Sequence, residues 1–363
     1  MKIKTSVLQD MVSRVGKCYS NNPAYPITSY LYIQLDNDVL SLVTTDMTNY
    51  FYANAKVDGE SKEFYASVLA DLFIKLVSST TSEYVELNMV EQNSGTYLEY
   101  KGNGKYKFEM QVDPGTGEIV KFRSCPEIEK EIGKVSLQTV KNILNLVKPA
   151  LATRIEMPCY TNYFVGDVVL ATDSEVINSL SINLFNEADE PLFISAPLMD
   201  LVGIMGGDEV TVFKDEQNIL FVSDTCSVYS TLYSYANQFR VSDIMSVTEW
   251  EFPSSCGVRR TELLQILDRL ALFLGDDENR AITLDFTKDE IKISTSAMSV
   301  GTESILYDYN NDFKEFTGTI SLDKLKSQIK AQSDDVINIS YGMQRAIKLT
   351  SENFLSIICL IQK

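Results

Sequence analysis

One short pattern recurs three times along the chain and limits the folds it can adopt. The segment VLSLVTTDM occupies residues 39–47, VVLATDSEV occupies 168–176, and the fainter EIKISTSAM occupies 290–298. Each copy begins with strand-like alternation and then breaks at small hydroxyl-bearing or acidic residues. Thr and Asp bond to nearby backbone groups, so we interpret Asp46 and Asp173 as turn residues rather than catalytic ones. The third copy carries Thr295 and Ser296 instead, which argues against a shared catalytic Asp.

The repeated segment belongs to a longer repeating order of elements. Each of the three passages reads as two β-α-β-β-β units, which gives six units along the 363 residues. A period of about 120 residues is too long for a solenoid of short repeats. The sequence therefore predicts an α+β fold of three similar domains at 1–125, 126–247 and 248–363, each with two helices packed on antiparallel sheets. Residues 113–133, rich in Gly, Pro and charge, are the first predicted linker, and residues 243–249 are the second.

Two short polar stretches are predicted to be hairpin turns. Asn37 and Asp38 separate two alternating strands, and the Gly-Asn-Gly sequence at 102–104 lies between two more. No phosphate-loop pattern surrounds the glycines, so they are interpreted as turn residues only.

Composition excludes several classes of function. The chain has no histidine, which removes the commonest general base and transition-metal ligand. Six cysteines are scattered without a CxxC pair, which is typical of buried, reduced thiols rather than of a zinc site or disulfide framework. No run approaches the length of a membrane span, and the first residues are too polar for a signal peptide. We therefore expect a cytoplasmic protein with no cofactor, no metal and no membrane partner.

Positive charge is concentrated in the predicted helices, although the net charge of the chain is −18. The helices are predicted at residues 6–18, 66–78, 136–148, 195–206, 259–274 and 321–332. They contain 11 basic and 6 acidic residues, whereas the remainder contains 21 basic and 44 acidic residues. The basic helix residues are Arg14, Lys17, Lys75, Lys141, Lys148, Arg259, Arg260, Arg269, Lys324, Lys326 and Lys330.

This segregation of charge indicates a nucleic-acid partner. Lys and Arg favour helices, so mixed charge on any single surface helix needs no functional explanation. Six related helices placed side by side in an acidic protein would instead form a positive lining for a phosphate backbone, bound without regard to sequence. The fourth helix, APLMDLVGIMGG, has no Lys or Arg and is the weakest member of the set.

Taken together, these features resemble the bacterial sliding clamp, the beta subunit of DNA polymerase III. The resemblance covers the whole chain and rests on the MKI…LQ start, YPITSYLYIQL at 25–35, LSLVTTD at 40–46, the Ala-Thr-Asp of the second domain and the apolar end FLSIICLIQK. Clamps of this family are rings in which two chains of three domains close head to tail around duplex DNA, with helices lining the hole and sheets outside. The resemblance implies a divergent, cellular or viral, processivity factor that is not an enzyme.

The resemblance also implies three functional surfaces. The basic helix residues would face double-stranded DNA. The contact between the two copies of the homodimer would place Phe108 and Met110 against Phe273 and Leu274. A pocket between the second and third domains would bind short apolar peptides of the polymerase and of the clamp loader. Its matching positions are Thr161, Thr172, Ser174, Glu175, Val176, Ile177, Met245, Ile357, Cys359 and Ile361.

Two departures and two alternatives remain open. Glu175 and Val176 replace the family's His-Arg pair, and the prolines expected near Arg240 and in the last strand are missing, so the family's preferred peptide is not carried over to this pocket. One alternative is a clamp-like decoy that binds partners but does not load on DNA. The other is an acidic, β-rich, metal-dependent enzyme, although no D-x-D-x-D-G loop or H-E-x-x-H helix is present. A loading assay and a metal-dependent melting shift would separate these alternatives from a clamp.

Overall fold

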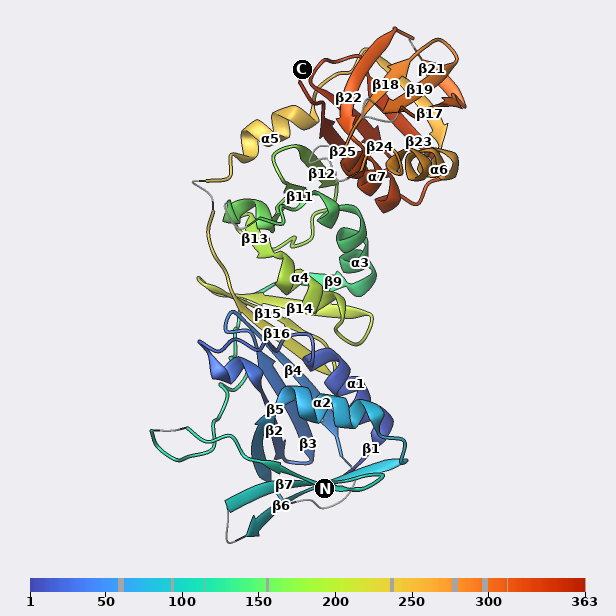
Figure 1. The fold of residues 1–363 in the computed structure, drawn as a ribbon. Helices are drawn as coiled ribbons and strands as arrows, with labels where there is room; N and C mark the ends of the chain where they lie inside the picture. Colours follow the sequence, from blue (N-terminus) through green and yellow to red (C-terminus); the bar gives the residue numbers. More distant parts are fainter. Residues whose placement is uncertain are drawn as a thin grey trace. The chain divides into compact units, whose positions relative to one another are not determined.

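A computed structural model gives the fold shown in Figure 1. The structure describes residues 1–57, 62–92, 95–113, 115–154, 157–235, 238–275, 280–295, 300–311 and 313–362. The chain divides into two compact units. Unit 1 comprises Met1–Val140 and Pro197–Tyr233, and unit 2 comprises Lys141–Ala196 and Ser234–Lys363.

The predicted order of one strand, one helix and three strands is confirmed six times along the chain. The first two repeats are β1 (Lys2–Lys4), α1 (Thr5–Val15), β2 (Tyr30–Asp36), β3 (Val39–Thr45), β4 (Asn49–Lys56), and β5 (Phe64–Leu69), α2 (Ala70–Ser79), β6 (Tyr84–Gln92), β7 (Gly95–Lys101), β8 (Lys105–Glu109). The next two are β9 (Glu131–Ser136), α3 (Leu137–Leu146), β10 (Asn162–Val165), β11 (Val169–Thr172), β12 (Val176–Leu180), and β13 (Leu192–Ser195), α4 (Ala196–Gly203), β14 (Glu209–Lys214), β15 (Asn218–Val222), β16 (Cys226–Thr231).

The last two repeats complete the series with two additional elements. They are β17 (Ser254–Arg259), α6 (Arg260–Ala271), β18 (Ala281–Phe286), β19 (Glu290–Thr295), β20 (Thr302–Leu306), and β22 (Phe316–Ser321), α7 (Leu322–Ala331), β23 (Val336–Tyr341), β24 (Ala346–Thr350), β25 (Phe354–Cys359). The additional elements are α5 (Val241–Thr248) and β21 (Tyr309–Asn311), together with the short 3-10 helices η1 (Pro26–Ser29), η2 (Lys148–Ala150) and η3 (Pro158–Thr161).

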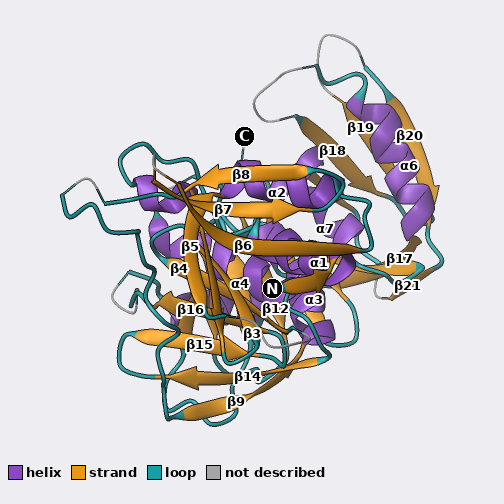
Figure 2. Cartoon of the chain, turned by 90° about the horizontal axis from the view of Figure 1, so that it is seen from below, coloured by secondary structure: helices purple, strands orange, loops and turns teal. Residues whose placement is uncertain are grey.

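Unit 1 contains two antiparallel sheets. Four strands follow the order β1-β6-β7-β8, and eight follow the order β5-β2-β3-β4-β16-β15-β14-β9. Strands β6, β7 and β8 lie side by side near the N-terminus in Figure 2. The larger sheet is continuous because β4 pairs with β16, with Tyr52 opposite Ser227. Strands from the first and second predicted domains therefore share one sheet.

Unit 2 is built in the same way. Its sheets have the orders β13-β10-β11-β12-β25-β24-β23-β17-β21 and β20-β19-β18-β22. The nine-stranded sheet is joined where β12 pairs with β25, with Ile177 opposite Ile357. The residues of the second predicted domain are thus divided between the two units, and the domain boundaries at 125/126 and 247/248 stay a prediction.

The helices bury one apolar face against these sheets. Leu8 and Val12 of α1 are fully buried at helical spacing, as are Phe73 and Val77 of α2. Phe73 contacts Tyr100 in an edge-on arrangement with ring centroids 6.1 Å apart. The two helices lie beside each other over the sheet that contains β2 and β3 (Figure 1). Their other faces are more exposed and carry polar residues together with Val7 and Leu72.

Several predicted helix ends are wrong, and local chemistry explains them. Helix α1 ends at Val15 with Gly16 as its C-cap, so Lys17 lies beyond the helix. Helix α2 begins at Ala70 rather than 66, because the preceding residues pair as β5 with β2. Helix α3 ends at Leu146, three residues before Pro149, which has no N–H and disfavours helical geometry in the residue before it. The prediction extended this helix to residue 148.

The two predicted linkers have different outcomes. Residues 120–130 have no regular secondary structure. Phe122 of this segment packs on the eight-stranded sheet of unit 1, with its ring centroid 5.8 Å from that of Tyr32. The second predicted linker instead forms most of helix α5, which the sequence analysis missed. Val241, Ile244 and Met245 of this helix pack against a buried aromatic cluster, so tertiary contacts stabilise it.

Candidate functional site

The repeated Thr-Asp segment forms a turn built by its own side chains, as predicted. The Asp173 Oδ1 atom accepts hydrogen bonds from the backbone N–H groups of Glu175 (2.8 Å) and Val176 (2.7 Å). The Asp46 Oδ1 atom does the same for Thr48 (2.9 Å) and Asn49 (2.7 Å) in the first copy. Both aspartates are therefore turn residues. The third copy cannot be compared in full, since Ser296 lies outside the described residues.

The turn at Asp173 is held against two elements from distant parts of the chain. The backbone N–H of Cys359, at the end of β25, donates to the Glu175 carbonyl oxygen at 2.8 Å. The first turn of α7 lies nearby, and its N-cap Ser321 accepts a hydrogen bond from the Lys324 backbone N–H at 3.4 Å. This places the Lys324 side chain beside the turn.

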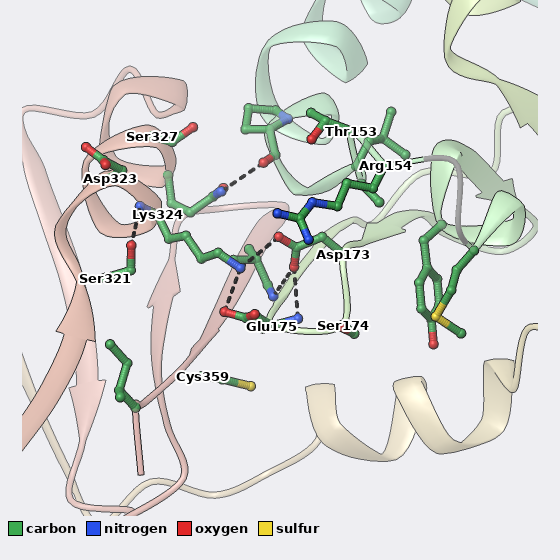
Figure 3. A pocket seen from close by; sticks show the side chains of 18 residues that line it. Thr153, Arg154, Asp173, Ser174, Glu175, Ser321, Asp323, Lys324, Ser327 and Cys359 are labelled. Atoms are coloured by element: carbon green, nitrogen blue, oxygen red, sulfur yellow. Dashed lines mark hydrogen bonds and ion pairs between the residues drawn. The ribbon is translucent and has the colours of Figure 1, made fainter. Parts of the chain in front are cut away.

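Lys324 connects α7 to the turn through two carboxylates. Its Nζ atom is 2.9 Å from Asp173 Oδ2 and 2.7 Å from Glu175 Oε2 (Figure 3). Burial alone would lower the pKa of Lys324, but its hydrogen bonds and ion pairs with Glu175 and Asp173 outweigh burial and raise this pKa above its usual value. Lys324 is therefore a charged part of this site rather than a free basic residue of α7.

Two buried side-chain amides, Asn178 and Gln328, add further hydrogen bonds between α7, β12 and the chain after α3. The Asn178 Nδ2 atom donates to Gln328 Oε1 at 2.6 Å and to the Leu146 carbonyl at 2.7 Å. Gln328 Nε2 donates in turn to the Pro149 carbonyl at 3.3 Å. Because buried amides are costly without partners, these bonds fix α7 to the strand β12 and to the chain after α3.

A pocket of about 760 Å³ opens at this junction. That volume lies within the range of about 300–1,000 Å³ typical of ligand sites. Apolar surface comes from Leu151, Met157, Val176 and Ile361, and polar surface comes from Arg154, Asp173, Glu175, Lys324 and Gln328. Figure 3 shows Arg154 projecting into the pocket from one wall and Lys324 from another. The arrangement suits an apolar side chain with a polar or charged neighbour.

The structure brings half of the predicted peptide-binding residues to this pocket. Ser174, Glu175, Val176, Cys359 and Ile361 line it. Five others do not line it: Thr161, Thr172, Ile177, Met245 and Ile357. Of these, Thr172 and Ile357 are buried, while Ile177 and Met245 pack against the aromatic cluster around Phe164 and Phe239. Thr161 bonds to the Pro158 carbonyl at 2.8 Å. Their part in partner binding stays a prediction.

The sequence analysis missed the charged side of the pocket. Lys324 was assigned to the DNA-facing set, but it lies 151 residues from Asp173 in the chain and binds that residue directly. Arg154 and Met157 lie in a segment without a recognisable pattern. The opposite charges of Lys324 and Glu175 were visible in the sequence, but nothing in their spacing predicted that they meet.

Several of the predicted DNA-facing cations form ion pairs within the chain. Arg14 pairs with Asp10 (2.9 Å), Lys75 with Asp71 (2.8 Å), Lys326 with Asp268 (2.5 Å), Arg259 with Asp308 (3.4 Å) and Arg269 with Glu303 (Nε–Oε1 2.8 Å). Arg260 instead donates to the carbonyls of Ile329 (3.1 Å) and Lys330 (3.2 Å). The positive charge of the helices is thus smaller than the count of basic residues suggests, although exposed pairs exchange readily with solvent.

The remaining cations are more open. Lys17, Lys141, Lys148 and Lys330 are exposed. Within the described ranges, Lys17 and Lys141 have no ion-pair or hydrogen-bond partner at their side chains. Arg14, by contrast, is packed against another part of unit 1. Its guanidinium lies so close to Gly206 that a Cβ atom added at Gly206 would be 2.0 Å from Arg14 Nη1. Arg14 also donates to the Cys226 sulfur at 3.7 Å, so it connects α1 to β16.

Three of the four residues predicted at the contact between copies are covered by the chain itself. Phe108, Met110 and Leu274 are 4%, 6% and 4% exposed, whereas Phe273 is 44% exposed. Strand β8 ends one sheet of unit 1, and β20 ends one sheet of unit 2. Exposed apolar residues accompany these edges: Tyr106 on β8, Leu306 on β20, and Leu272 and Val300 near the end of α6. An unpaired strand edge beside apolar surface is suited to pairing with another chain.

The described residues show no sign of a metal centre. No group of three or more Cys, Asp or Glu residues among them could hold an ion. All six cysteines are free. Cys359 is exposed in the pocket and Cys125 is half-buried, so the prediction that all are buried is wrong for these two. Among the helices within the described ranges, none has both the length and the apolar character that a membrane span requires.

Comparison with known proteins identifies the fold. No protein-family model and no curated protein sequence matches the chain. Solved structures do match over their whole length. The DNA polymerase sliding clamp of Bacillus subtilis is 18% identical with a TM-score of 0.85, and 100% of this chain and 98% of that chain are covered. The beta subunit from the DNA polymerase of Streptococcus pyogenes is 17% identical with a TM-score of 0.86, and 100% and 99% are covered.

A third match comes from a distant bacterium. The DNA polymerase III beta subunit of Thermotoga maritima is 14% identical with a TM-score of 0.87, and 100% of this chain and 99% of that chain are covered. At sequence identities this low, the agreement concerns the arrangement of the helices and strands. The chain therefore has the fold of the bacterial DNA polymerase III beta subunit, the DNA polymerase sliding clamp.

Proposed function

We propose that this protein is a DNA sliding clamp, a processivity factor that encircles duplex DNA and tethers a polymerase. The observation that carries the proposal is the full-length match to DNA polymerase sliding clamps at TM-scores of 0.85 to 0.87. The protein has no catalytic role in this proposal. It acts in the cytoplasm on DNA, and it holds DNA because a ring of two copies is closed around it.

The exposed cations support weak, sequence-independent contact with DNA. Lys17, Lys141, Lys148 and Lys330 would contact phosphates directly. Cations such as Lys75 and Lys326, already paired with carboxylates, would contribute less because each contact with DNA must replace an internal ion pair. Such contacts are screened by salt and are compatible with sliding. Retention would then depend on ring closure rather than on affinity.

The pocket at the Asp173 turn supports the tethering of partners. Its apolar surface and its charged rim suit a short peptide with apolar anchor residues from the polymerase or the clamp loader. Five of the predicted positions line the pocket, and its walls are held by the buried bonds of Asn178 and Gln328. A fixed pocket of this kind keeps the ordering cost of binding low.

The strand edges support pairing between two copies. We expect β8 of one copy to pair with β20 of the other, because both are unpaired edges of antiparallel sheets among the described residues of the single chain. Such a contact is head-to-tail, and two of them close a ring. Leu272, Phe273 and Val300 would be covered in that contact.

The mass of the protein in solution tests this proposal first. Sedimentation equilibrium should give twice the 40.8 kDa of one chain at micromolar concentration. Adding Lys or Pro substitutions on β20, for example Ser304→Pro, should give single chains because proline removes a donor from the edge strand. Ser304→Ala, which keeps the backbone N–H at the same position, is the matched control. A wild-type protein that stays monomeric at all concentrations would contradict the ring.

One observation favours the second candidate, a clamp-like decoy that binds partners without loading on DNA. Helix α4 carries no Lys or Arg, and at least six of the predicted DNA-facing cations are ion-paired inside the chain. The decoy would form the same two-chain species and bind the same peptides. It would differ only in its failure to associate with circular DNA, so a loading assay decides between the two.

A further inference from the structure

The charged groups of the pocket are unevenly matched. Two carboxylates, those of Asp173 and Glu175, share the single ammonium group of Lys324. Asp173 uses both of its oxygens, one for the two turn N–H groups and one for Lys324. Glu175 uses only Oε2, and its Oε1 atom has no partner within the described part of the chain. The pocket therefore presents one unused carboxylate oxygen.

The three charged side chains of this cluster, Asp173, Glu175 and Lys324, differ in their exposure to solvent. The side chains of Asp173 and Lys324 are 23% and 28% exposed, so both belong to the wall of the pocket. The Glu175 side chain is 64% exposed and reaches towards solvent at the pocket opening. An incoming ligand would thus meet Glu175 before it met the other two groups.

Glu175 is also held in place before any ligand arrives. Its backbone N–H is bonded to Asp173, its carbonyl accepts from Cys359, and its carboxylate is bonded to Lys324. Asp323 also lines the pocket, and it pairs with Arg280 at 3.4 Å. Arg154 is exposed at the pocket too, but it has no such bonds among the described residues. Because a fixed group loses less entropy on binding, Glu175 is the better placed of the two to select a charge.

The same carboxylates also act on the Cys359 thiol, which lines the pocket. Burial raises the pKa of Cys359, and the negative charges of Glu175 and Asp173 raise it further, with Lys324 only partly opposing them. Apolar surface adjoins the same place, since Met157 is 52% exposed and Ile361 also lines the pocket. A fixed carboxylate at the opening beside apolar surface suits a ligand that carries a cation next to an apolar side chain.

We propose that this pocket selects apolar peptide motifs that carry a Lys or Arg beside the apolar anchor. Glu175 accepts a hydrogen bond from that cation, and Lys324 is the internal competitor for the same carboxylate. The inference rests on the proposed function, because it names the partner chemistry of the tethering pocket. It makes two opposite predictions, since removing Glu175 and removing Lys324 should change the selection in opposite directions.

Peptide selection tests the charge preference without knowledge of the natural partner. The immobilised full-length protein is panned with a phage-displayed library of random heptapeptides, and the Glu175→Gln variant is panned in parallel. Wild type should enrich peptides with Lys or Arg next to an apolar pair, and Glu175→Gln should enrich apolar peptides without that excess of cations. Enrichment of apolar peptides without a cation, or with Asp or Glu, by wild type would overturn the inference and leave the pocket assignment intact.

Titration of the selected peptide measures the size of the effect. Replacing its cation by norleucine should weaken binding to wild type by about 2–5-fold, the range of an exposed ion pair, measured by fluorescence anisotropy. The same replacement should have no effect with Glu175→Gln and a larger effect with Lys324→Met. Lys288→Met, in the turn between β18 and β19 and outside the pocket, is the matched control and should bind both peptides as wild type does. A smaller effect with Lys324→Met would contradict the competitor role.

Failure of this inference differs from failure of the proposed function. If no peptide is enriched on wild type, the pocket is not a peptide site and both the pocket assignment and its selectivity are overturned. Retention on circular DNA involves none of the pocket residues, so it tests the clamp role independently. A ring that retains DNA but shows no preference for cations would overturn the selectivity alone.

Discussion

At the scale of single residues, the turns of this protein are made by aspartate side chains. The Oδ1 atoms of Asp46 and Asp173 each accept hydrogen bonds from two backbone N–H groups, so the Oδ2 atom of each residue can bind another group. In the first copy that oxygen binds the Asn49 side chain at 2.8 Å, and in the second it binds Lys324 at 2.9 Å. The same arrangement thus holds only its own turn in one copy, whereas in the other it also lines the pocket.

Asp215 offers a test of how much such a turn contributes to stability. Its carboxylate accepts from the N–H groups of Gln217 (2.9 Å) and Asn218 (2.7 Å) in the turn between β14 and β15. Burial would raise the pKa of Asp215, but hydrogen bonds from Asn218 and Gln217 outweigh it, and the pKa lies below its ordinary value. A lowered folded-state pKa gives stability at pH values above the unfolded-state pKa, and this stability is lost as the pH falls through the folded-state pKa.

We therefore expect Asp215→Ala to lower the free energy of unfolding by about 1 kcal/mol at pH 7, the typical cost of losing such a side-chain acceptor. The difference from wild type should shrink below about pH 4, close to the ordinary Asp pKa. Urea denaturation at pH 7 and pH 3 measures both values. Asp224→Ala is the control, because the Asp224 carboxylate makes no hydrogen bond within the described residues. A difference that is equal at both pH values would contradict this account.

Ile357 and Ile361 form a second matched pair of residues. Ile361 lines the pocket, whereas Ile357 is 1% exposed in the core of the sheet. Ile361→Ala should reduce stimulation of a partner polymerase and affinity for a selected peptide, with little change in melting temperature. Ile357→Ala should lower the free energy of unfolding by about 2–5 kcal/mol through a buried cavity. Unchanged peptide affinity in Ile361→Ala would remove this residue from the binding site.

At the scale of elements, the sequence predicts what depends on local pattern. The six β-α-β-β-β units follow from periodicity, and the Asn37-Asp38 turn follows from residues that tolerate positive φ, here 45° and 61°. The Gly102–Gly104 hairpin, closed by a bond from the Gly102 N–H to the Gly104 carbonyl at 2.9 Å, is confirmed for the same reason. The exact end of α1 and the existence of α5 depended on capping and on tertiary packing, and both were missed.

The pocket also combines features that the sequence predicts with features that depend on tertiary packing. Its turn was predicted, because Thr172 to Glu175 form a local motif. Its ion pairs were not, because Lys324 meets Asp173 and Glu175 across 151 and 149 residues of chain. Basic residues on helices can be counted in a sequence, but their partners are set by the packing of other elements. This is why the helix cations were predicted correctly as helical in most cases but their pairing was not.

The helices themselves give a prediction about DNA contact. Lys17→Glu with Lys141→Glu should weaken DNA association more than Lys324→Glu with Lys326→Glu, because the first pair has no internal partner and the second is ion-paired. The measurement is association with nicked circular DNA as a function of salt. Loss of two phosphate contacts should reduce the slope of log affinity against log salt by about 2. Equal effects of the two pairs would contradict the assignment of the unpaired lysines to the DNA-facing surface.

At the scale of the whole molecule, the fold is that of the DNA polymerase sliding clamps, and the proposed function depends on closure of a ring of two copies. A net charge of −18 opposes general affinity for DNA, so a protein of this composition needs another way to remain on it. A ring of two copies, closed by pairing of β8 of each copy with β20 of the other, would hold the protein on DNA without high affinity. Neither the charge count nor the pocket would explain retention if the ring did not close.

Retention on circular DNA tests this claim most directly. Protein assembled in the presence of a nicked circular plasmid is separated from free protein by gel filtration, and half of the sample is then cut once with a restriction enzyme. The account predicts that protein stays on the intact circles in salt that screens ionic contacts and is lost rapidly from the linear molecules over their free ends. Equal loss from circular and linear DNA would contradict the closed ring.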